Sequence, residues 1–309
     1  MIIDVHFHHT IEDWLPEAWW NVLAGIYVHA LKAMRIDMTA EDVKQNIFPG
    51  FWDPEVEVLI REMDAAGIDK TVILPLDCGI SLGEPKISYQ EQNRAYAEVQ
   101  RKHPDRIIAF AGVDPRRPDA IELVETAVKE WGMKGLKLHP GSGFYPNGRE
   151  TYRLLERVCD LGVPVLFHTG QGLLYDKYCD PVYLDDLLVD FPELTIIAAH
   201  LGHGWHNTLF AMAMFKLNLA TDFSQWQFAA RDHYHYFCEV LRRALDSFGS
   251  DRVLFGTDGP YLRPGMPDKD WVQLIKDLPT KAPEGITFTE AEVEAMLGGN
   301  AARILGLSE

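Results

Sequence analysis

Two histidines near the start of the chain have the spacing of a pair of metal ligands. His6 and His8 lie in residues 4–8, DVHFH, which have the composition of a strand. Side chains at positions i and i+2 of a strand project from the same face, so both imidazoles can reach one ion. An isolated pair of this kind belongs to the core or the surface more often than to a metal site. The pair becomes informative only if other ligand types converge on it.

Residues of ligand or acid–base type recur at the ends of further apolar segments. His139, His168, His200 and Asp258 each close such a segment. In a closed barrel of parallel strands, catalytic side chains come from the carboxyl ends of several strands. The recurrence therefore predicts that these side chains meet the histidine pair at one site.

The segments that must position these residues alternate between strand and helix. The apolar segments are short and mostly continuous, which is typical of parallel strands buried on both faces. Segments 53–67, 117–132 and 149–162 are predicted as helices, the first and last ending on a glycine suited to a C-cap. The pattern predicts an α/β fold, a (β/α)₈ TIM barrel forming a single domain over residues 1–309. The eight predicted strands are 2–7, 71–76, 107–113, 135–139, 164–168, 194–200, 217–222 and 252–258.

Composition excludes several classes of partner. The 309 residues are 47% hydrophobic, enough for a large core, and the net charge of −17 would repel nucleic acid and anionic membranes. The four cysteines form no CxxC pair, so neither a disulfide framework nor a cysteine zinc site is predicted. No segment has the roughly 20 apolar residues of a membrane span. We therefore expect a cytoplasmic protein with a small-molecule substrate.

Residues 10–52 form an aromatic-rich insertion after the first predicted strand. A loop that follows a barrel strand lies over the active-site end, so the insertion could cover the substrate pocket. Alternatively, it forms a separate hydrophobic cluster or a contact between two copies in a homodimer. Its aromatic residues are Trp14, Trp19, Trp20, Tyr27, Phe48, Phe51 and Trp52.

Motifs spread over the chain resemble the amidohydrolase superfamily, within it the group of aminocarboxymuconate semialdehyde decarboxylase and the resorcylate decarboxylases. The resemblance implies a mononuclear site with His6, His8, His168 and Asp258 as ligands and His200 as the catalytic histidine. The motifs, in order, are DVHFH (4–8), MDAAGIDKTVI (63–73), GLKLHP (135–140), FHTG (167–170), AAHLGHGW (198–205), LATDFS (219–224), LFGTDGP (254–260) and GNAARILGL (299–307).

Such a ligand set predicts one Zn²⁺ per chain, or another divalent transition metal such as Mn²⁺. Imidazole and carboxylate ligands suit Zn²⁺, and a site with an open position is catalytic rather than structural. Zinc brings the pKa of bound water to about 7, which supplies hydroxide at neutral pH. In this scheme Asp258 relays a proton, and His200 donates one or stabilises a developing oxyanion.

Two reactions fit the same ligands. We favour hydrolysis of an amide, a lactone or a related ester, and the alternative is non-oxidative decarboxylation of a small aromatic or unsaturated acid. A third interpretation, an inactive binding barrel, conflicts with the intact set of ligand types. A decarboxylase is expected to hold its acidic substrate with arginine, and the candidates are Arg35, Arg149, Arg231 and Arg263.

Three more residues are candidates for contacts around the metal or the substrate. Lys137 shares a strand face with His139, and some binuclear members of the superfamily carry a carboxylated bridging lysine on the fourth strand. We expect Lys137 to be unmodified, because a lysine cation would repel a second metal ion. His203 occupies a position where relatives often have glycine, so it could shape the substrate pocket.

Overall fold

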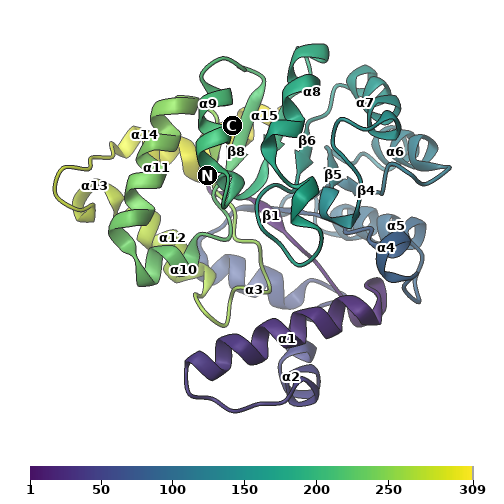
Figure 1. Ribbon diagram of the computed structural model, residues 1–309, viewed down its shortest axis with the longest axis horizontal. Helices are drawn as coiled ribbons and strands as arrows, with labels where there is room; N and C mark the ends of the chain where they lie inside the picture. Colours follow the sequence, from purple (N-terminus) through teal and green to yellow (C-terminus); the bar gives the residue numbers. More distant parts are fainter. Residues whose placement is uncertain (308–309) are drawn as a thin grey trace.

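The computed structural model describes residues 1–307, which form a barrel of parallel strands surrounded by helices (Figure 1). The strands are β1 (Ile3–Phe7), β2 (Lys70–Ile73), β3 (Ile107–Ala109), β4 (Ala111–Gly112), β5 (Leu136–Leu138), β6 (Val165–Phe167), β7 (Ile196–Ala198), β8 (Leu219–Asp222) and β9 (Val253–Leu254). The α-helices are α1 (Glu17–Ala33), α2 (Ala40–Asn46), α3 (Glu57–Ala66), α4 (Gly79–Leu82), α5 (Tyr89–Lys102), α6 (Ala120–Lys129), α7 (Arg149–Leu161), α8 (Asp185–Asp190), α9 (His206–Ala213), α10 (Gln227–Asp232), α11 (Tyr234–Phe248), α12 (Asp268–Lys276), α13 (Leu278–Lys281), α14 (Glu290–Glu294) and α15 (Asn300–Ile304).

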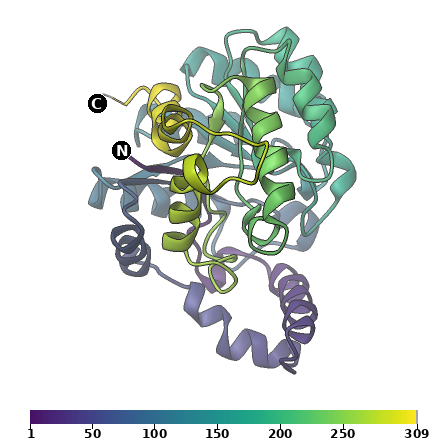
Figure 2. The same ribbon diagram turned by 90° about the vertical axis from the view of Figure 1, so that its left-hand side faces the viewer.

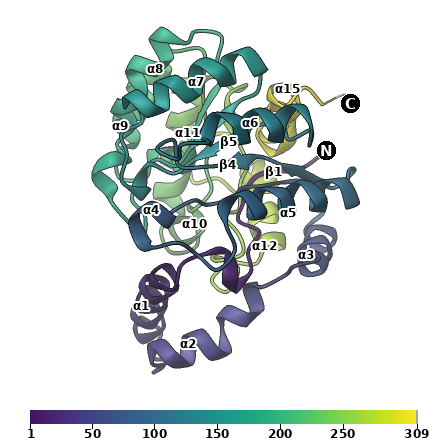
Figure 3. The ribbon, with the colours of Figure 1, turned by 90° about the vertical axis from the view of Figure 1, so that its right-hand side faces the viewer.

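The strands follow one another around the barrel in chain order. Two parallel sheets, β1-β2-β3 and β4-β5-β6-β7-β8-β9, make up the wall. The last strand returns to the first, because the amide of Val5 donates to the carbonyl of Phe255 at 3.0 Å and the amide of Asp258 donates to the carbonyl of His6 at 2.7 Å. Figure 3 shows the N-terminus beside α15, where this closure occurs. The predicted TIM barrel is confirmed.

One predicted strand is interrupted. Residues 107–113 form β3 and β4, with Phe110 between them. The amide of Phe110 still bonds to Ile73 on β2, whereas the amide of Ala111 bonds to Gly135 next to β5. The phenyl ring of Phe110 lies where a Cβ on Gly135 would be, so packing of this ring against the neighbouring backbone accompanies the change of partner.

The predicted helices are present, and two of them end as their sequences indicate. The C-caps of α3 and α7 are Gly67 and Gly162, with φ of 71° and 66°. Only glycine adopts this left-handed conformation without strain.

Residues 10–52 contain α1 and α2, which stand outside the ring of barrel helices (Figures 2 and 3). They form a hydrophobic cluster of their own, in which Trp20 packs against Phe48 and Phe48 against Phe51, with ring centroids 5.3 and 5.8 Å apart. Trp14 instead packs into the main core. Among residues 1–307, no helix is long and apolar enough to cross a membrane.

Candidate metal centre

Three of the predicted ligands meet at the carboxyl end of β1. His6 is on β1, His8 follows it, and Asp258 lies in the loop after β9. The Nε2 atoms of His6 and His8 are 3.3 Å apart, and Oδ1 of Asp258 is 3.3 Å from the first and 3.2 Å from the second. All three residues are buried, and their donor atoms lie within 4.8 Å of one another. This geometry is that of three ligands converging on one point.

Neighbouring groups fix which nitrogen of each histidine faces that point. Nδ1 of His6 is 3.0 Å from Oδ2 of Asp222, and Nδ1 of His8 is 3.0 Å from the carbonyl of Leu74. A carboxylate and a carbonyl only accept hydrogen bonds, so each Nδ1 carries the proton. Both Nε2 atoms therefore present lone pairs to the same space, as expected of histidine metal ligands.

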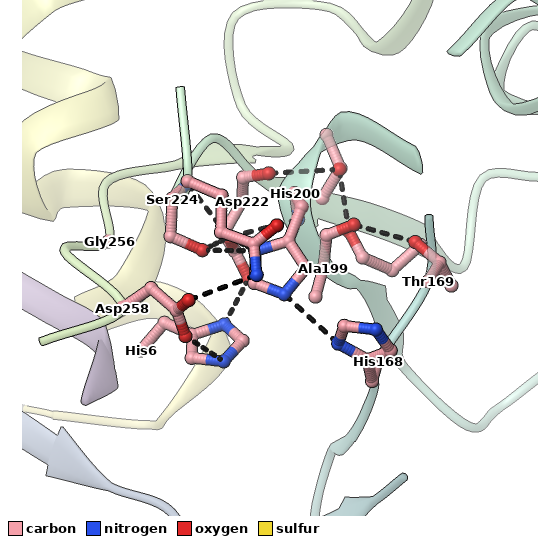
Figure 4. A network of polar contacts seen from close by, with 12 residues as sticks. His6, His168, Thr169, Ala199, His200, Asp222, Ser224, Gly256 and Asp258 are labelled. Carbon is pink, nitrogen blue, oxygen red and sulfur yellow. Dashed lines mark hydrogen bonds and ion pairs between the residues drawn. The ribbon is translucent and has the colours of Figure 1, made fainter. Parts of the chain in front are cut away.

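His168, the fourth predicted ligand, does not join this group. Its Nδ1 lies 3.2 Å from Nε2 of His200, whose own Nδ1 is 2.7 Å from Oγ of Ser224 (Figure 4). The Ser224 hydroxyl donates to Asp222, so its oxygen accepts from His200. His200 Nε2 is then an acceptor and the proton between the rings belongs to His168 Nδ1. Nε2 of His168 is left as a buried lone pair with no hydrogen-bond partner among the described residues.

Asp222, at the end of β8, connects these histidines and was missed by the sequence analysis. It accepts hydrogen bonds from His6 Nδ1, the Ser224 hydroxyl and the backbone amides of His200 and Ser224. Burial acts to raise its pKa, but the contacts with His6, His200 and Ser224 outweigh burial and hold the pKa well below the ordinary value. Its position at a strand end was the signal that could have identified it.

Lys137 contacts one of the three ligands. It is buried on β5, with Nζ 3.2 Å from Nε2 of His6. Burial lowers the pKa of Lys137 to about 8, in opposition to the nearby charges of Asp258 and Asp222. His139, just after β5, stacks on His168 with ring centroids 4.5 Å apart.

A second group of possible ligands, His6, His200 and Asp222, is better explained as a hydrogen-bond network. Nδ1 of His6 and Nδ1 of His200 both carry protons in the scheme above, so neither offers a lone pair to an ion. Asp222 is fully occupied by donors. We therefore do not propose this group as a second metal centre.

The backbone is strained where it presents two of the site residues. His200 and Asp258 have φ of 62° and 52°, in the left-handed region that non-glycine residues rarely adopt. Gln225, with φ of 68°, donates from its side chain to Oδ2 of Asp258 at 3.0 Å. Such backbone strain is typical of functional sites.

Asp258 was predicted to end a strand, but the strand stops at Leu254 and the chain turns so that the Asp258 amide bonds to His6.

Burial lowers the pKa values of His6, His168 and His200 and so keeps these three histidines neutral. Burial lowers the pKa of His200 to about 3, and burial followed by the charge of Lys137 lowers that of His6. For Asp258, burial acts to raise the pKa, but the close contact with His8 and the nearby His200 and His6 lower it far below the ordinary value. Neutral imidazoles around an ionised carboxylate are the protonation states that bind a divalent cation.

A cavity of about 800 Å³ opens above this centre. Its floor is polar and contains Asp258 and several histidines, whereas α1, residues 171–173, α10, residues 261–262 and residues 264–265 supply mostly apolar walls. The predicted substrate residue His203 lines it, but Lys137 and His200 do not. The polar floor residues are His8, His139, His168 and Asp258, and the larger apolar wall residues are Trp19, Leu23, Ile26, Tyr27, Leu31, Met34, Ile36, Leu76, Leu173, Phe228, Tyr261 and Leu262.

Of the four candidate arginines, only Arg231 lines the cavity, and its guanidinium is paired with Asp232 at 2.7 Å. Arg263 is bonded to Asp268. The described lining thus has no unpaired cation to hold a substrate carboxylate. That role falls to the floor of the cavity.

The residues present fit a divalent metal. The floor combines converging Nε2 lone pairs, an ionised carboxylate and the orphaned Nε2 of His168, which Gly172 approaches so closely that a Cβ there would be 2.8 Å away. Imidazole and carboxylate together suit zinc, manganese and similar ions. The fold and this floor define the class of metal-binding barrel enzymes.

Comparison with known proteins places the chain more narrowly. Residues 3–307 match the family model described as Amidohydrolase, so the chain belongs to that family, as the motifs indicated. The gamma-resorcylate decarboxylase of Rhizobium sp. (strain MTP-10005) is 25% identical over 257 residues, 65% of this chain and 76% of that protein. Two solved structures share the fold.

The first is 5-carboxyvanillate decarboxylase from Sphingomonas paucimobilis, with a TM-score of 0.72, 18% identity and 99% of each chain covered. The second is 5-carboxyvanillate decarboxylase from Novosphingobium aromaticivorans, complexed with manganese and 4-hydroxy-3-methoxy-5-nitrobenzoic acid. Its TM-score is 0.67 at 16% identity, covering 99% of this chain and 96% of that chain.

Proposed function

We propose that this protein is a metal-dependent decarboxylase that removes CO₂ from a small aromatic acid without oxidation. The observation that carries the proposal is the cavity, in which predicted metal ligands form the floor and apolar side chains form the walls. The relatives named above act on gamma-resorcylate and 5-carboxyvanillate, both aromatic acids. These observations support decarboxylation better than the hydrolysis that the sequence analysis favoured.

His6, His8, His168 and Asp258 would hold the metal, with His168 turning its free Nε2 toward the other three. A bound metal would act as a Lewis acid that attracts the anionic oxygens of the substrate. The manganese in a related structure makes Mn²⁺ a candidate beside Zn²⁺. His139, which stacks on His168 and lines the cavity, is placed to contact the same oxygens.

The apolar walls favour the loss of charge that decarboxylation brings. A carboxylate is costly to keep in an apolar environment, whereas CO₂ is neutral. The electron pair of the broken carbon–carbon bond stays on the ring carbon, which then takes up one proton. We assign the relay of this proton to Asp258, because it lines the cavity and Gln225 orients its Oδ2. Asp258 is ionised at rest, so it would first accept a proton from solvent water and then pass it to the ring carbon. His200 lies behind Asp258 and His168, so it is expected to act on the substrate through them.

The test is a product assay on metal-loaded protein. The protein is incubated with 2,6-dihydroxybenzoate, 5-carboxyvanillate and a panel of simple lactones and amides. The expected result is release of CO₂ with an equal amount of the phenol, and no release by metal-free protein. Hydrolysis of a lactone or amide, with no CO₂ from any acid, would establish the hydrolase instead. Bicarbonate labelled with ¹³C, supplied with the phenol, tests the reverse reaction.

A further inference from the structure

The cavity is larger than the acids that the relatives act on. A dihydroxybenzoate has about eleven non-hydrogen atoms, and even at the roughly 30 Å³ that a water molecule occupies in the liquid it would fill less than half of about 800 Å³. The unfilled part extends away from the polar floor.

One face of α1 forms the wall of this outer part. Residues 19, 23, 26, 27, 30, 31, 33 and 34 line the cavity with the spacing of one helix face. From Trp19 to Met34 the helix rises about 22 Å. Phe228 and Leu262 also line the cavity, together with the partly exposed Arg231–Asp232 pair.

The exposure of this helix face increases with distance from the floor. Trp19, which is in edge contact with His139, and Leu23 are 3% and 4% exposed, whereas Ile26 and Met34 are 48% and 61% exposed. A channel results, closed at the catalytic end and open at the other, with apolar side chains along it. Exposed apolar surface continuous with a reactive site is typical of a surface that binds apolar ligand.

We infer that the natural substrate is an aromatic acid bearing a long apolar substituent, which lies along α1 while the carboxylate reaches the metal centre. This inference rests on the proposed function for the aromatic acid. The apolar substituent itself is inferred from the channel. The insertion thus determines specificity, whereas the barrel supplies the chemistry.

The experiment uses 2,4-dihydroxy-6-alkylbenzoates with hydrogen, methyl, propyl, pentyl and heptyl at position 6. Burial of one methylene corresponds to about a fourfold gain, so kcat/KM should rise at least tenfold from methyl to pentyl. Calorimetric binding of the matching 5-alkylresorcinols measures the same preference without turnover. Their affinity should rise with chain length in parallel.

Ile26→Glu places a carboxylate in the channel and should lower the pentyl-to-methyl ratio of kcat/KM at least tenfold. Val22→Glu is the matched control, since Val22 is exposed on the same helix but does not line the cavity. The pentyl-to-methyl ratio of kcat/KM in Val22→Glu should equal that of the wild type.

The two hypotheses fail in different ways. If the acids are decarboxylated with no dependence on chain length, the inference on the substituent is wrong and the proposed reaction stands. If no acid releases CO₂ while alkylresorcinol affinity rises with length and falls in Ile26→Glu, the reaction is wrong and the apolar channel stands. If Ile26→Glu instead converts a dimer into a monomer, with no dependence on chain length, the helix face is a contact between copies and the inference fails.

Discussion

Each nitrogen at the centre of the site has an assignable role. Asp222 and the Leu74 carbonyl hold the protons of His6 and His8 on Nδ1, and this leaves lone pairs on their Nε2 atoms, the one on His6 within 3.2 Å of Nζ of Lys137. Partners of this kind orient metal ligands and raise their basicity. Asp222 thus matters to the metal although it is not a predicted ligand, and the site depends on a hydrogen-bond network as much as on its ligands.

Replacing both His6 and His8 by alanine should remove the metal and leave the barrel folded. Their Nε2 atoms supply two of the three converged donors, while the core that stabilises the barrel consists of other residues. Elemental analysis should show metal in the wild type and less than a tenth as much in the variant, with the same circular dichroism. A wild type that contains no metal after reconstitution would contradict the proposed centre.

Asp258→Asn should lower kcat at least about a hundredfold, the low end for a lost acid–base group. The amide keeps the shape of the side chain but can neither exchange the proton nor neutralise a cation. Metal content must be measured in the same preparation, because weaker metal binding would add to the loss. A fully metal-loaded variant with nearly normal kcat would remove Asp258 from the chemistry.

Sequence alone located most of the residues of this site but not their contacts. His6, His8 and Asp258 were predicted from strand ends and motifs, and they do converge. The contact of His168 with His200, instead of with these three, depends on the rotation of one imidazole, which no sequence pattern encodes. Asp222 also ends a strand, but its role appears only when β8 lies between β7 and β9.

At the scale of the elements, eight predicted strands correspond to nine observed ones, and most were predicted too long. The difference at residues 107–113 arises because Phe110 packs on Gly135, a contact between segments 25 residues apart. Helix ends were easier to predict, because glycine C-caps are local signals. Residues 10–52 contribute to a separate hydrophobic cluster, and α1 also lines the cavity, while the role of this segment in covering the substrate or in a contact between copies stays a prediction.

Gly256, between β9 and Asp258, should not tolerate a side chain. A Cβ there would lie 2.9 Å from Cβ of His6 and 3.1 Å from Cβ of Ser224. Gly256→Ala should therefore destabilise the protein by about 1–3 kcal/mol, as overpacking of a core does, and weaken metal binding. Gly25→Ala on α1 is the control, since nothing lies within 4 Å of its Cβ and alanine should stabilise that helix by about 0.5–1 kcal/mol. Urea denaturation of both variants measures these effects, and equal effects would refute the packing argument.

The N-terminus of α14 should make stability depend on pH. Glu292 bonds back to the amide of Thr289 at 2.8 Å and to Arg242 on α11 at 2.8 Å. Burial acts to raise the pKa of Glu292, but these hydrogen bonds outweigh burial and lower the pKa from 4.5. A lowered carboxyl pKa means that the stabilisation is present above pH 4.5 and is lost as the pH falls through the pKa of the folded state.

Glu292→Gln should accordingly lower stability by about 1 kcal/mol at pH 7, the usual value of such a cap. The difference from the wild type should shrink as the pH falls from 5 to 3.5. Urea denaturation at several pH values measures it. A difference that stays constant over this range would show that the charge of Glu292 does not contribute.

At the scale of the whole molecule, the negative net charge and the proposed metal centre together restrict which anions can bind. The net charge of −17 disfavours anionic polymers as partners, whereas a small acid can still bind at a bound cation. The barrel brings ligands from strands far apart in sequence to one end, and α1 adds an apolar wall there. This combination supports the proposal that the substrate is a small amphipathic acid.

The number of metal ions per chain tests this organisation most directly, and we predict one. A second ion would need a bridging anion on β5, which only a carboxylated Lys137 could supply, and lone pairs that His6 and His200 do not offer at Nδ1. Lys137 in its ordinary form would repel a second divalent cation. Because the pKa of Lys137 is lowered to about 8, part of the lysine is a neutral amine that could be carboxylated by CO₂. The test must therefore use conditions that favour this carboxylation. Anomalous scattering from crystals grown with bicarbonate and excess Zn²⁺ or Mn²⁺ should show one peak beside His6, His8 and Asp258. Two peaks about 3.5–4 Å apart, joined by density that continues from Lys137, would show a binuclear site and would favour hydrolysis over decarboxylation.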